Sequence, residues 1–436
     1  SIRVRSCWKS PNKSLLLYSI TKNILRMMLY KLISPSMVKA TIQLPASKSI
    51  SNRALIINAL GKGIYSPENL SDCDDTQVMI KALTEDKETI DILAAGTAMR
   101  FLTAYLSVTS GERTITGTAR MQQRPIQILV NALRELGADI EYTGNEGFPP
   151  LHIIGTELKK NEITLKGNVS SQYISALLMI GPVLKNGLTL QLSGEIISRP
   201  YINLTLQLMN DFGAKAAWTA PNRISVAPQP YESIPFTVES DWSAASYWYQ
   251  IAALSSKAEI ELLGLFHQSY QGDSRGAEVF SRLGITTEFT AKGIKLKKTG
   301  KAPKRLDEDF VDIPDLAQTF VVACALLNIP FRFTGLQSLK IKETDRITAL
   351  RNELKKLGYL IEEENDSVLM WNGERCTPEQ TPMIQTYEDH RMAMAFAPAA
   401  ILYPNLQIVE PEVVSKSYPN YWEDLRQAGF QIINVK

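Results

Sequence analysis

Three residues able to bind anions stand near the start of one expected helix. Lys48, Ser49 and Arg53 follow a Pro-Ala-Ser turn in the segment LPASKSISNRALIINAL (residues 44–60), and an apolar run continues beyond them. This spacing brings an amine, a hydroxyl and a guanidinium to a helix N-terminus, where unpaired N–H groups already favour anions. An ordinary capped helix with solvated basic residues has the same local pattern, so the interpretation depends on whether the pattern recurs.

Polar residues also begin the other helices that we expect to be buried. These junctions contain Gly96-Thr97 with Arg100, Ser170-Ser171-Gln172, Asp241, Asp315, and Asp389-His390-Arg391. Each junction alone is typical of a simple N-cap. Together they predict that several helix N-termini face one cleft, where their partial positive charges add to the side-chain cations. Such a cleft would hold two anionic molecules, or one molecule with several acidic groups.

Three further segments supply groups that suit catalysis. A carboxylate flanked by cations, such as Glu343 or Asp315, suits general acid–base chemistry. Arginine forks suit carboxylate and phosphate groups, and lysine supplies a mobile point charge. The segments are KETDRI (residues 342–347, with Lys342, Glu343 and Arg346), QQRPI (122–126, with Arg124) and VVSKSYPNYW (413–422, with Lys416).

The composition is that of a large globular protein. Its 436 residues are 44% hydrophobic and 21% charged, which is enough for two or three cores. The net charge of +2 includes seven basic and no acidic residues in positions 1–37, so the remainder carries −5. A mildly acidic body argues against a nucleic-acid binder. Four cysteines without a CxxC pair, and three histidines, argue against a disulfide framework or a zinc site and fit a reducing cytoplasm.

Residues 1–37 differ in character from the rest of the chain. They are basic, rich in serine and free of acids, which is typical of a transit peptide. The alternative is that Met37 is the natural start and that the preceding residues are upstream or added sequence. We favour this alternative because an alternating strand pattern begins at Val38. We therefore expect residues 1–37 to lie outside the fold.

A pattern of amphipathic helix, glycine and alternating strand recurs along the chain. A helix that ends directly before a strand commonly ends in a left-handed residue, a conformation that glycine adopts best. About 40 residues before each glycine lies a second helix without a charged face, which we expect to be buried. The glycines are Gly137, Gly213, Gly284, Gly358 and Gly429, and the buried helices are expected at residues 97–106, 172–180, 243–254, 315–327 and 390–402.

The repeat predicts the domain organisation. A less regular unit begins at the helix that contains Arg53, with its second helix near residues 76–83, so the chain would hold six α/β units in two similar domains of three. The last unit stops near Val435 and needs another strand, which we expect from residues 38–44. This predicts a discontinuous domain of residues 38–46 and 241–436, with residues 47–240 inserted as the second domain. The two crossings, near Ala46 and Ser240, would act as a hinge.

With these segments in view, the chain resembles the 5-enolpyruvylshikimate-3-phosphate synthases, the 3-phosphoshikimate 1-carboxyvinyltransferases. The resemblance covers residues 38–436 and rests on LPASKSISNRA, AGTAMR, QRPI, SSQYISALLM, SRPYI, IPD, KETDR and TYEDHRMAM, in that order. It implies two inside-out α/β barrel domains. It also implies transfer of the enolpyruvyl group of phosphoenolpyruvate to the 5-hydroxyl of shikimate 3-phosphate, with release of phosphate, in chorismate and aromatic amino acid biosynthesis. A cytoplasmic monomer without metal, cofactor, nucleic-acid or membrane partner is expected.

The resemblance also assigns roles to residues. Asp315 would be the base toward the 5-hydroxyl, and Glu343, with Lys48, would donate a proton to the methylene carbon and later accept it through a tetrahedral addition–elimination intermediate. Shikimate 3-phosphate would be held by Ser49, Arg53, Ser170, Ser171, Gln172, Ser198, Tyr201, Asp315 and Lys342. Phosphoenolpyruvate would be held by Lys48, Gly96, Arg124, Gln172, Arg346, Arg391 and Lys416.

Three positions depart from the family pattern, and two rival functions remain open. Ala94, Phe101 and Ser338 stand where the family has Asn, Pro and Asn, and none of these changes removes a charged group. The rival within the same architecture is a UDP-N-acetylglucosamine enolpyruvyl transferase, which usually has a cysteine in the loop that here reads GTARMQQRP (residues 117–125). The rival of another class is a polyanion- or RNA-binding repeat protein, which would need a basic outer face.

Overall fold

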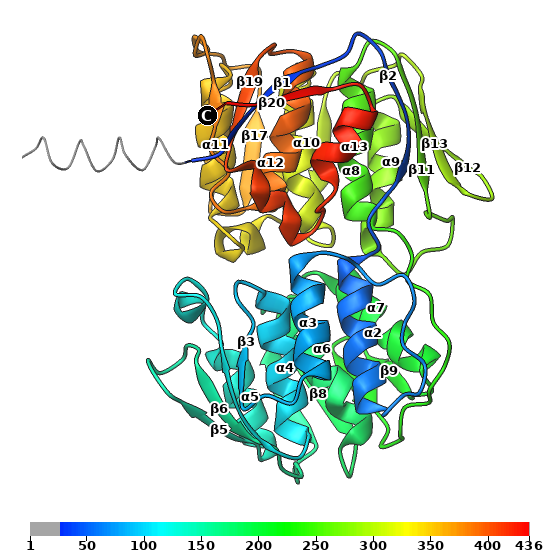
Figure 1. Cartoon of the computed structure of the whole chain (residues 1–436), viewed down its shortest axis with the longest axis vertical. Coiled ribbons are helices and arrows are strands. Elements are labelled where there is room, and N and C mark those ends of the chain that lie inside the picture. Colours follow the sequence, from blue (N-terminus) through cyan, green and yellow to red (C-terminus); the bar gives the residue numbers. More distant parts are fainter. Residues whose placement is uncertain (1–26, 436) are drawn as a thin grey trace, which may run out of the picture.

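The computed structural model describes residues 27–435, which form two halves of similar construction joined at a narrow waist (Figure 1). One hydrophobic core is built from residues between Ala46 and Val238, and we call this part the inserted half. The other core combines Leu32–Leu44 with residues between Trp242 and Phe430, and we call it the discontinuous half. The residue boundaries predicted for the two domains remain a proposal, and these two separate cores support them.

Within the described residues, five four-stranded sheets repeat one topology. Each sheet has a parallel pair of strands followed by an antiparallel pair, as in the order β3-β4-β6-β5. Of the less regular sixth unit, the described part has helices α2 and α3 and one isolated parallel bridge between Glu68 and Thr237. The repeat predicted from the sequence is therefore present, with its first unit reduced.

The inserted half contains two of these sheets and six α-helices. Its first sheet has β3 (Thr89–Asp91), β4 (Glu112–Thr116), β5 (Asp139–Tyr142) and β6 (Leu151–Ile154), and its second has β7 (Glu162–Lys166), β8 (Leu188–Ser193), β9 (Ala216–Ala220) and β10 (Arg223–Val226). The helices are α2 (Lys48–Leu60), α3 (Asp74–Thr84), α4 (Gly96–Val108), α5 (Gln127–Leu136), α6 (Ser171–Ile180) and α7 (Arg199–Asp211), with 3-10 turns η1 (Met121–Gln123) and η2 (Gly181–Val183).

The discontinuous half contains the other three sheets. They are β2 (Val38–Gln43) with β11 (Ala258–Leu263), β12 (Ile285–Phe289) and β13 (Gly293–Lys298); β14 (Leu306–Asp309) with β15 (Phe331–Thr334), β16 (Glu362–Glu364) and β17 (Val368–Trp371); and β1 (Leu29–Ile33) with β18 (Met383–Ile384), β19 (Leu406–Val409) and β20 (Gln431–Asn434). Its helices are α8 (Trp242–Leu254), α9 (Gly276–Arg282), α10 (Ala317–Leu326), α11 (Arg346–Lys356), α12 (His390–Phe396) and α13 (Tyr421–Gln427). The 3-10 turns are η3 (Gly272–Arg275), η4 (Pro314–Leu316), η5 (Gln337–Ile341), η6 (Ala397–Ile401) and η7 (Pro411–Lys416).

The predicted boundary at residue 38 is wrong for residues 29–33. Strand β1 lies between β19 and β20 and pairs with both in antiparallel register, and Leu32 is fully buried. Strand β1, and not residues 38–44, therefore supplies the strand that the last unit lacks. Strand β2 instead pairs in parallel with β11 and begins the first unit of the discontinuous half. Residues 1–26 of the predicted leader lie outside the described residues.

The two helices of each unit follow the predicted pattern. Every residue of α8 is buried, as its apolar sequence requires. The five repeat glycines all adopt positive φ angles, from 87° at Gly284 to 115° at Gly137, in the turns that follow α5, α7, α9, α11 and α13. Within residues 27–435, no helix is both long enough and apolar enough to cross a membrane.

The chain passes between the halves at two adjacent points. Ala46 and Ser240 form an antiparallel bridge, and the N–H of Asp241 donates to the carbonyl of Pro45 at 2.9 Å. The N–H of Ser47 donates to the carbonyl of Glu239 at 2.8 Å. The two crossings therefore lie side by side, at the place where α2 and α8 begin.

Candidate active site between the two halves

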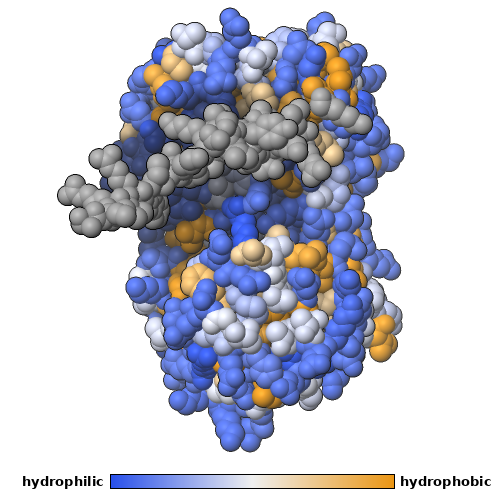
Figure 2. Space-filling view, turned by 60° about the vertical axis from the view of Figure 1, so that its left-hand side comes forward, coloured by the Kyte–Doolittle hydropathy of each residue, from blue (hydrophilic) through white to orange (hydrophobic). Residues whose placement is uncertain are grey.

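The predicted polar junctions meet where the two halves face each other. Figure 2 shows a recess at this level, with hydrophilic side chains in its visible part. Helices α2 and α6 begin with side-chain caps from Ser47 and Ser170, while α8 and α12 begin with caps from Asp241 and Asp389. The capping serines and aspartates are thus N-caps as well as neighbours of the candidate site.

Asp315 lies at the centre of a network of cations on the discontinuous half. Its carboxylate is 3.3 Å from Arg346, 3.4 Å from Arg391 and 3.7 Å from Lys342. Burial opposes ionisation of Asp315, but these three cations outweigh it and hold the pKa of the carboxyl well below its usual range. Asp315 is therefore a carboxylate at neutral pH, as a general base must be.

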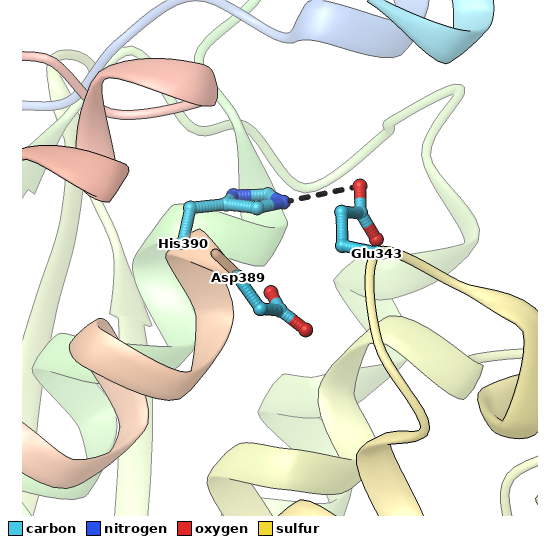
Figure 3. Close-up of side chains that lie close together, drawn as sticks. All are labelled: Glu343, Asp389 and His390. Atoms are coloured by element: carbon cyan, nitrogen blue, oxygen red, sulfur yellow. Dashed lines mark ion pairs between the residues drawn. The ribbon is translucent and has the colours of Figure 1, made fainter. Parts of the chain in front are cut away.

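Glu343 is the second acid of this network. Its carboxylate lies 2.7 Å from Arg346 and 3.2 Å from Lys416, and 3.6 Å from Nε2 of His390 (Figure 3). Burial would raise the pKa of Glu343, but Lys416 and Arg346 together hold it well below the usual range. Burial also lowers the pKa of His390 to about 4, so this imidazole is neutral at pH 7.

Arg346 connects the two acids to a third carboxylate. Its guanidinium donates to Asp389 from Nε at 2.7 Å, and to Asp315 and Glu343 from its terminal nitrogens. The arginine is 1% exposed, so it can be held here only by being paired on several sides. Asp389 also caps α12 through the N–H of Arg391, which fixes the direction of that helix.

Glu343, Asp389 and His390 are the one group within the described residues whose spacing suits a metal ion (Figure 3). Arg346 already pairs with both carboxylates, and Lys416 pairs with Glu343. A divalent cation would have to displace these positive charges or bind beside them, so the group fits a metal poorly. The expectation of a reaction without metal or cofactor stays a prediction.

The inserted half supplies its own cations. Nζ of Lys48 lies 3.1 Å from Asp75. Burial lowers the pKa of Lys48, but Asp75, Cys73 and Glu343 together outweigh burial and raise it. Arg53 donates to Thr205, Ser175 and the carbonyl of Ser49, and burial lowers its pKa to about 10. Both side chains remain protonated at pH 7. Ser49 and Tyr201 line one small cavity between the halves together with Asp241 and Asp273.

Gly96, Arg124 and Gln172 lie together near the start of α4. A Cβ atom at Gly96 would lie 2.6 Å from a terminal nitrogen of Arg124, so only glycine leaves this guanidinium in place. Gln172 donates to Thr97 at 3.0 Å and accepts a hydrogen bond from Arg100. The predicted contact residues from α4, α6 and the loop before α5 are thereby brought to one place.

The residues predicted to hold shikimate 3-phosphate are brought together less completely. Ser198 adopts a left-handed φ of 52°, and its N–H donates to the carbonyl of Val311 on the other half at 3.0 Å. Tyr201 donates to Asp315 at 3.1 Å. The side chain of Ser170 caps α6. Within residues 27–435, no side-chain hydrogen bond joins Ser170 or Ser171 to Ser198.

The two halves are in contact through several predicted residues. Nζ of Lys416 lies 3.5 Å from the carbonyl of Ala94, and Ser415 donates to Asp74 at 2.7 Å. With the Tyr201–Asp315 bond, these contacts place groups of both halves around one site.

Comparisons with known proteins agree with this geometry. A sequence model described as EPSP synthase (3-phosphoshikimate 1-carboxyvinyltransferase) matches residues 33–91 and 83–425. The chain belongs to the EPSP synthase family. A 3-phosphoshikimate 1-carboxyvinyltransferase from Bacteroides fragilis is 77% identical over 405 residues, which cover 93% of this chain and 99% of the relative. One from Shewanella sediminis is 36% identical over 413 residues, covering 88% of this chain and 96% of the relative.

Solved structures show the same fold at low identity. An EPSP synthase from Acinetobacter baumannii aligns with a TM-score of 0.74 at 22% identity, covering 94% of this chain and 100% of that chain. The enolpyruvyl transferase NikO from Streptomyces tendae aligns with a TM-score of 0.75 at 14% identity and the same coverage. The predicted two-domain α/β architecture of the EPSP synthase family is confirmed by these similarities.

Several residues of this EPSP synthase family member were not singled out as site residues from the sequence. Asp75 pairs with Lys48, Tyr247 accepts a hydrogen bond from Arg391 at 3.1 Å, and Ser417 bonds Nδ1 of His390. These partners lie 27 to 144 positions away in sequence. No local sequence motif indicates such pairs. Asp75 follows another acid in the first turn of α3, which is typical of an ordinary helix N-terminus.

Proposed function

We infer that this protein transfers the enolpyruvyl group of phosphoenolpyruvate to the 5-hydroxyl of shikimate 3-phosphate and releases phosphate. Family membership supports this reaction, and one structural observation carries the assignment of the chemistry. Two carboxylates, Asp315 and Glu343, are held ionised by neighbouring cations at the junction of the halves, and Arg346 pairs with both. A base for a hydroxyl and a proton carrier for a carbon are therefore available in one site.

In the proposed addition step, Asp315 accepts the proton of the 5-hydroxyl of shikimate 3-phosphate. The oxygen of this hydroxyl bonds at the same time to the central carbon of phosphoenolpyruvate. The methylene carbon takes up a proton from Glu343, which gives a tetrahedral intermediate. In the elimination step, Glu343 takes a proton back from that carbon, the double bond re-forms and the bond to the phosphate oxygen breaks. The proton that Asp315 accepted leaves with the phosphate, which regenerates the Asp315 carboxylate. The cations around the site stabilise the charge that develops on the departing phosphate.

Glu343 must gain a proton before it can donate one. Lys416 and Arg346 now keep its pKa low. We propose that the phosphate and carboxylate of phosphoenolpyruvate draw Lys416 away from Glu343, which raises the pKa of that carboxyl when the substrate is bound. The pKa of Lys48 is raised because Asp75, with Cys73 and Glu343, outweighs burial. We therefore propose that Lys48 acts as a fixed positive charge and leaves the proton transfer to Glu343.

The proposed contacts to the two substrates also come from both halves. We propose that Arg124, Arg346, Arg391 and Lys416 surround phosphoenolpyruvate beside Gly96, with Lys48 and Gln172 on the inserted half. For shikimate 3-phosphate we propose Ser49 and Arg53 at the carboxylate, Asp315 and Lys342 at the ring hydroxyls, and Tyr201 at the ring. The proposed phosphate contacts are Ser170, Ser171, Gln172 and Ser198, from the starts of α6 and α7.

We also propose that the protein acts as a monomer in the cytoplasm. Cys73, Cys324 and Cys376 are free, and two of them are buried, which suits a reducing compartment. Sedimentation equilibrium of the purified protein tests the monomer. A mass that is a multiple of the 48.7 kDa of one chain would contradict it.

Coupled phosphate release tests the function. Purified protein should release phosphate with shikimate 3-phosphate and phosphoenolpyruvate together, and none when either substrate is omitted. A second arm replaces shikimate 3-phosphate with UDP-N-acetylglucosamine. Turnover in that arm alone would support the rival enolpyruvyl transferase and contradict our proposal. Salt-sensitive binding of RNA without any turnover would instead favour the polyanion-binding alternative.

A further inference from the structure

The loop between β4 and α5 extends one arginine, Arg120, toward the other half. The loop is fixed on the inserted half, because the N–H of Thr118 donates to the carbonyl of Leu93 at 3.0 Å and the side chain of Met121 is buried. Gly117 allows a close approach here, since a Cβ atom would lie 2.5 Å from the Leu93 carbonyl. Arg120 directly precedes η1, and its side chain makes no capping hydrogen bond to that turn.

Arg120 has two acceptors on the discontinuous half. Its guanidinium bonds the carboxylate of Glu388 and the main-chain carbonyl of Glu343. The side chains of Arg120 and Glu388 are 50% and 62% exposed, so the ion pair by itself contributes little stability. The bond to the carbonyl is different in kind, because it fixes the backbone of the residue that we propose to carry the proton.

The turn that presents Glu388 is itself constrained. Tyr387 and Glu388 both adopt left-handed φ angles, 55° and 56°, which side-chain-bearing residues rarely do. The turn is held from within, because the hydroxyl of Tyr387 donates to Glu353 at 2.7 Å and the N–H of Asp389 donates to the carbonyl of Thr386 at 2.8 Å. Consecutive residues of this turn therefore serve two partners, Glu388 bonding Arg120 and Asp389 bonding Arg346.

The same loop also carries Arg124, which lies across η1 from Arg120 and packs against Gly96. A contact that holds Arg120 against Glu343 therefore holds Arg124 and Glu343 on opposite sides of one substrate. Both acceptors of Arg120 belong to the other half, so its bonds form only when the halves are together. We propose that Arg120 is a positioning residue, which brings the loop at residues 117–124 and the backbone of Glu343 into register when the site closes. This inference rests on the proposed function.

Replacement of Arg120 by glutamine tests the proposal. We expect Arg120→Gln to lower kcat by about tenfold or more, the size expected for one lost charge-assisted hydrogen bond that forms in the closed site. The KM for shikimate 3-phosphate should change little, because Arg120 contacts none of the residues proposed to bind it. Arg120→Lys keeps the charge but loses the two-pronged geometry and should recover part of kcat.

Two matched variants separate positioning from general effects. Arg113→Gln removes another arginine of the inserted half, whose partner Asp86 lies 2.6 Å away on the same half, and should behave as the wild type. Glu388→Gln removes the ion pair but leaves the Glu343 carbonyl, so its loss should be smaller than that of Arg120→Gln. Equal kinetics of Arg120→Gln and Arg113→Gln would overturn the proposal. Loss of shikimate 3-phosphate binding together with a lowered melting temperature would also overturn it, because it would indicate a structural role.

A readout without turnover keeps this test distinct from the test of function. Solution scattering with both substrates should show a smaller decrease in radius of gyration for Arg120→Gln than for Arg113→Gln. An identical decrease in both variants would overturn the positioning role while leaving the enzymatic function intact. A wild-type protein without phosphate release would contradict the function, and the scattering comparison with shikimate 3-phosphate alone would still decide whether Arg120 joins the halves.

Discussion

Tyr201 of the inserted half donates a hydrogen bond to Asp315 of the discontinuous half at 3.1 Å. Burial raises the pKa of Tyr201 well above its ordinary value, with Asp273 and Asp315 adding to the effect, so the hydroxyl keeps its proton and remains a donor. The carboxylate that we propose as the base is therefore oriented by cations of its own half and by a phenol of the other. Its geometry depends on both halves being in contact.

Replacement of Asp315 should abolish most turnover and spare binding. We expect Asp315→Ala or Asp315→Asn to lower kcat by about 10²–10⁴-fold, the usual contribution of a general base. Shikimate 3-phosphate should still bind in equilibrium dialysis, because the cations that bind anions remain. Tyr201→Phe is the matched control: it removes only the hydroxyl and should lower kcat much less. Near-normal turnover in Asp315→Asn would contradict the assignment.

Replacement of Glu343 should give a loss of similar size with a different pH profile. Glu343→Gln and Glu343→Ala remove the proposed proton carrier, so kcat should fall by orders of magnitude. The alkaline limb of the wild-type profile of kcat against pH, where Glu343 has lost the proton that it must donate, should disappear from any residual activity. Stopped-flow and steady-state phosphate release measure both. Glu364→Gln, which removes an acid of β16 that is paired with Arg332, is the control. A residual profile identical to that of the wild type would refute the role of Glu343.

The repeat was predictable because it depends on short-range rules. Gly137 and its four counterparts end helices directly before strands, and a left-handed turn at such a place strongly favours glycine. The buried helices were equally clear, since α8 has no charged face that could contact water. Spacing along the chain thus determines the units and also which ends of the helices carry polar groups.

The wrong boundary at residue 38 and the site partners that the sequence did not reveal have a different origin. Strand β1 has the sequence LYKLI and is only five residues long, inside a basic stretch, so its role is visible only once β19 and β20 are in place on either side. The partner of Lys48 and both acceptors of Arg120 were hidden for the same reason, because they come from elements distant in sequence. Local patterns name the reactive residues, whereas their partners follow from tertiary packing.

The pKa of Asp273 predicts a pH-dependent stability. Burial, with Asp315 nearby, raises this pKa from 3.8 to about 7, and one carboxylate oxygen of Asp273 is buried without a hydrogen-bond partner. Between these two pH values the folded protein holds a proton that the unfolded chain has lost, so this residue lowers the free energy of unfolding as the pH rises through that range. Above pH 7 the full cost of a buried carboxylate remains.

Asp273→Asn should therefore stabilise the protein at pH 8, by on the order of 2 kcal/mol. The gain should shrink toward pH 5, because Asp273 is then increasingly protonated in the folded wild type. Urea denaturation at the two pH values measures it, with Asp139→Asn, an exposed acid on β5, as the control. A gain that is the same at pH 5 and pH 8 would show that ionisation of Asp273 is not its cause.

Closure should depend on ligand. The site places Lys48, Arg53 and Arg124 opposite Arg391 and Lys416, and without bound anions these cations repel one another across the junction. Phosphate and carboxylate groups would neutralise the repulsion and favour the contacts described between the halves. We expect the radius of gyration in solution scattering to decrease when shikimate 3-phosphate is added. An unchanged radius at saturating ligand would contradict this expectation.

Inhibition by glyphosate, which occupies the phosphoenolpyruvate site in the resembled family, should be weak. Gly96 is retained beside Arg124, so nothing blocks the site directly. Phe101, however, replaces a proline in α4, is fully buried, and has its ring centroid 5.2 Å from the guanidinium carbon of Arg53. This packing constrains the start of α4, and Ala94 removes an amide side chain from the preceding loop. Phosphoenolpyruvate is short and held by cations, so it should tolerate a slight shift of the helix start better than the longer inhibitor.

The double variant Phe101→Pro with Ala94→Asn should therefore be inhibited at lower glyphosate concentration than the wild type, when both are assayed at the same ratio of phosphoenolpyruvate to KM. Equal sensitivity would mean that Phe101 and Ala94 only repack the helix start without changing the site.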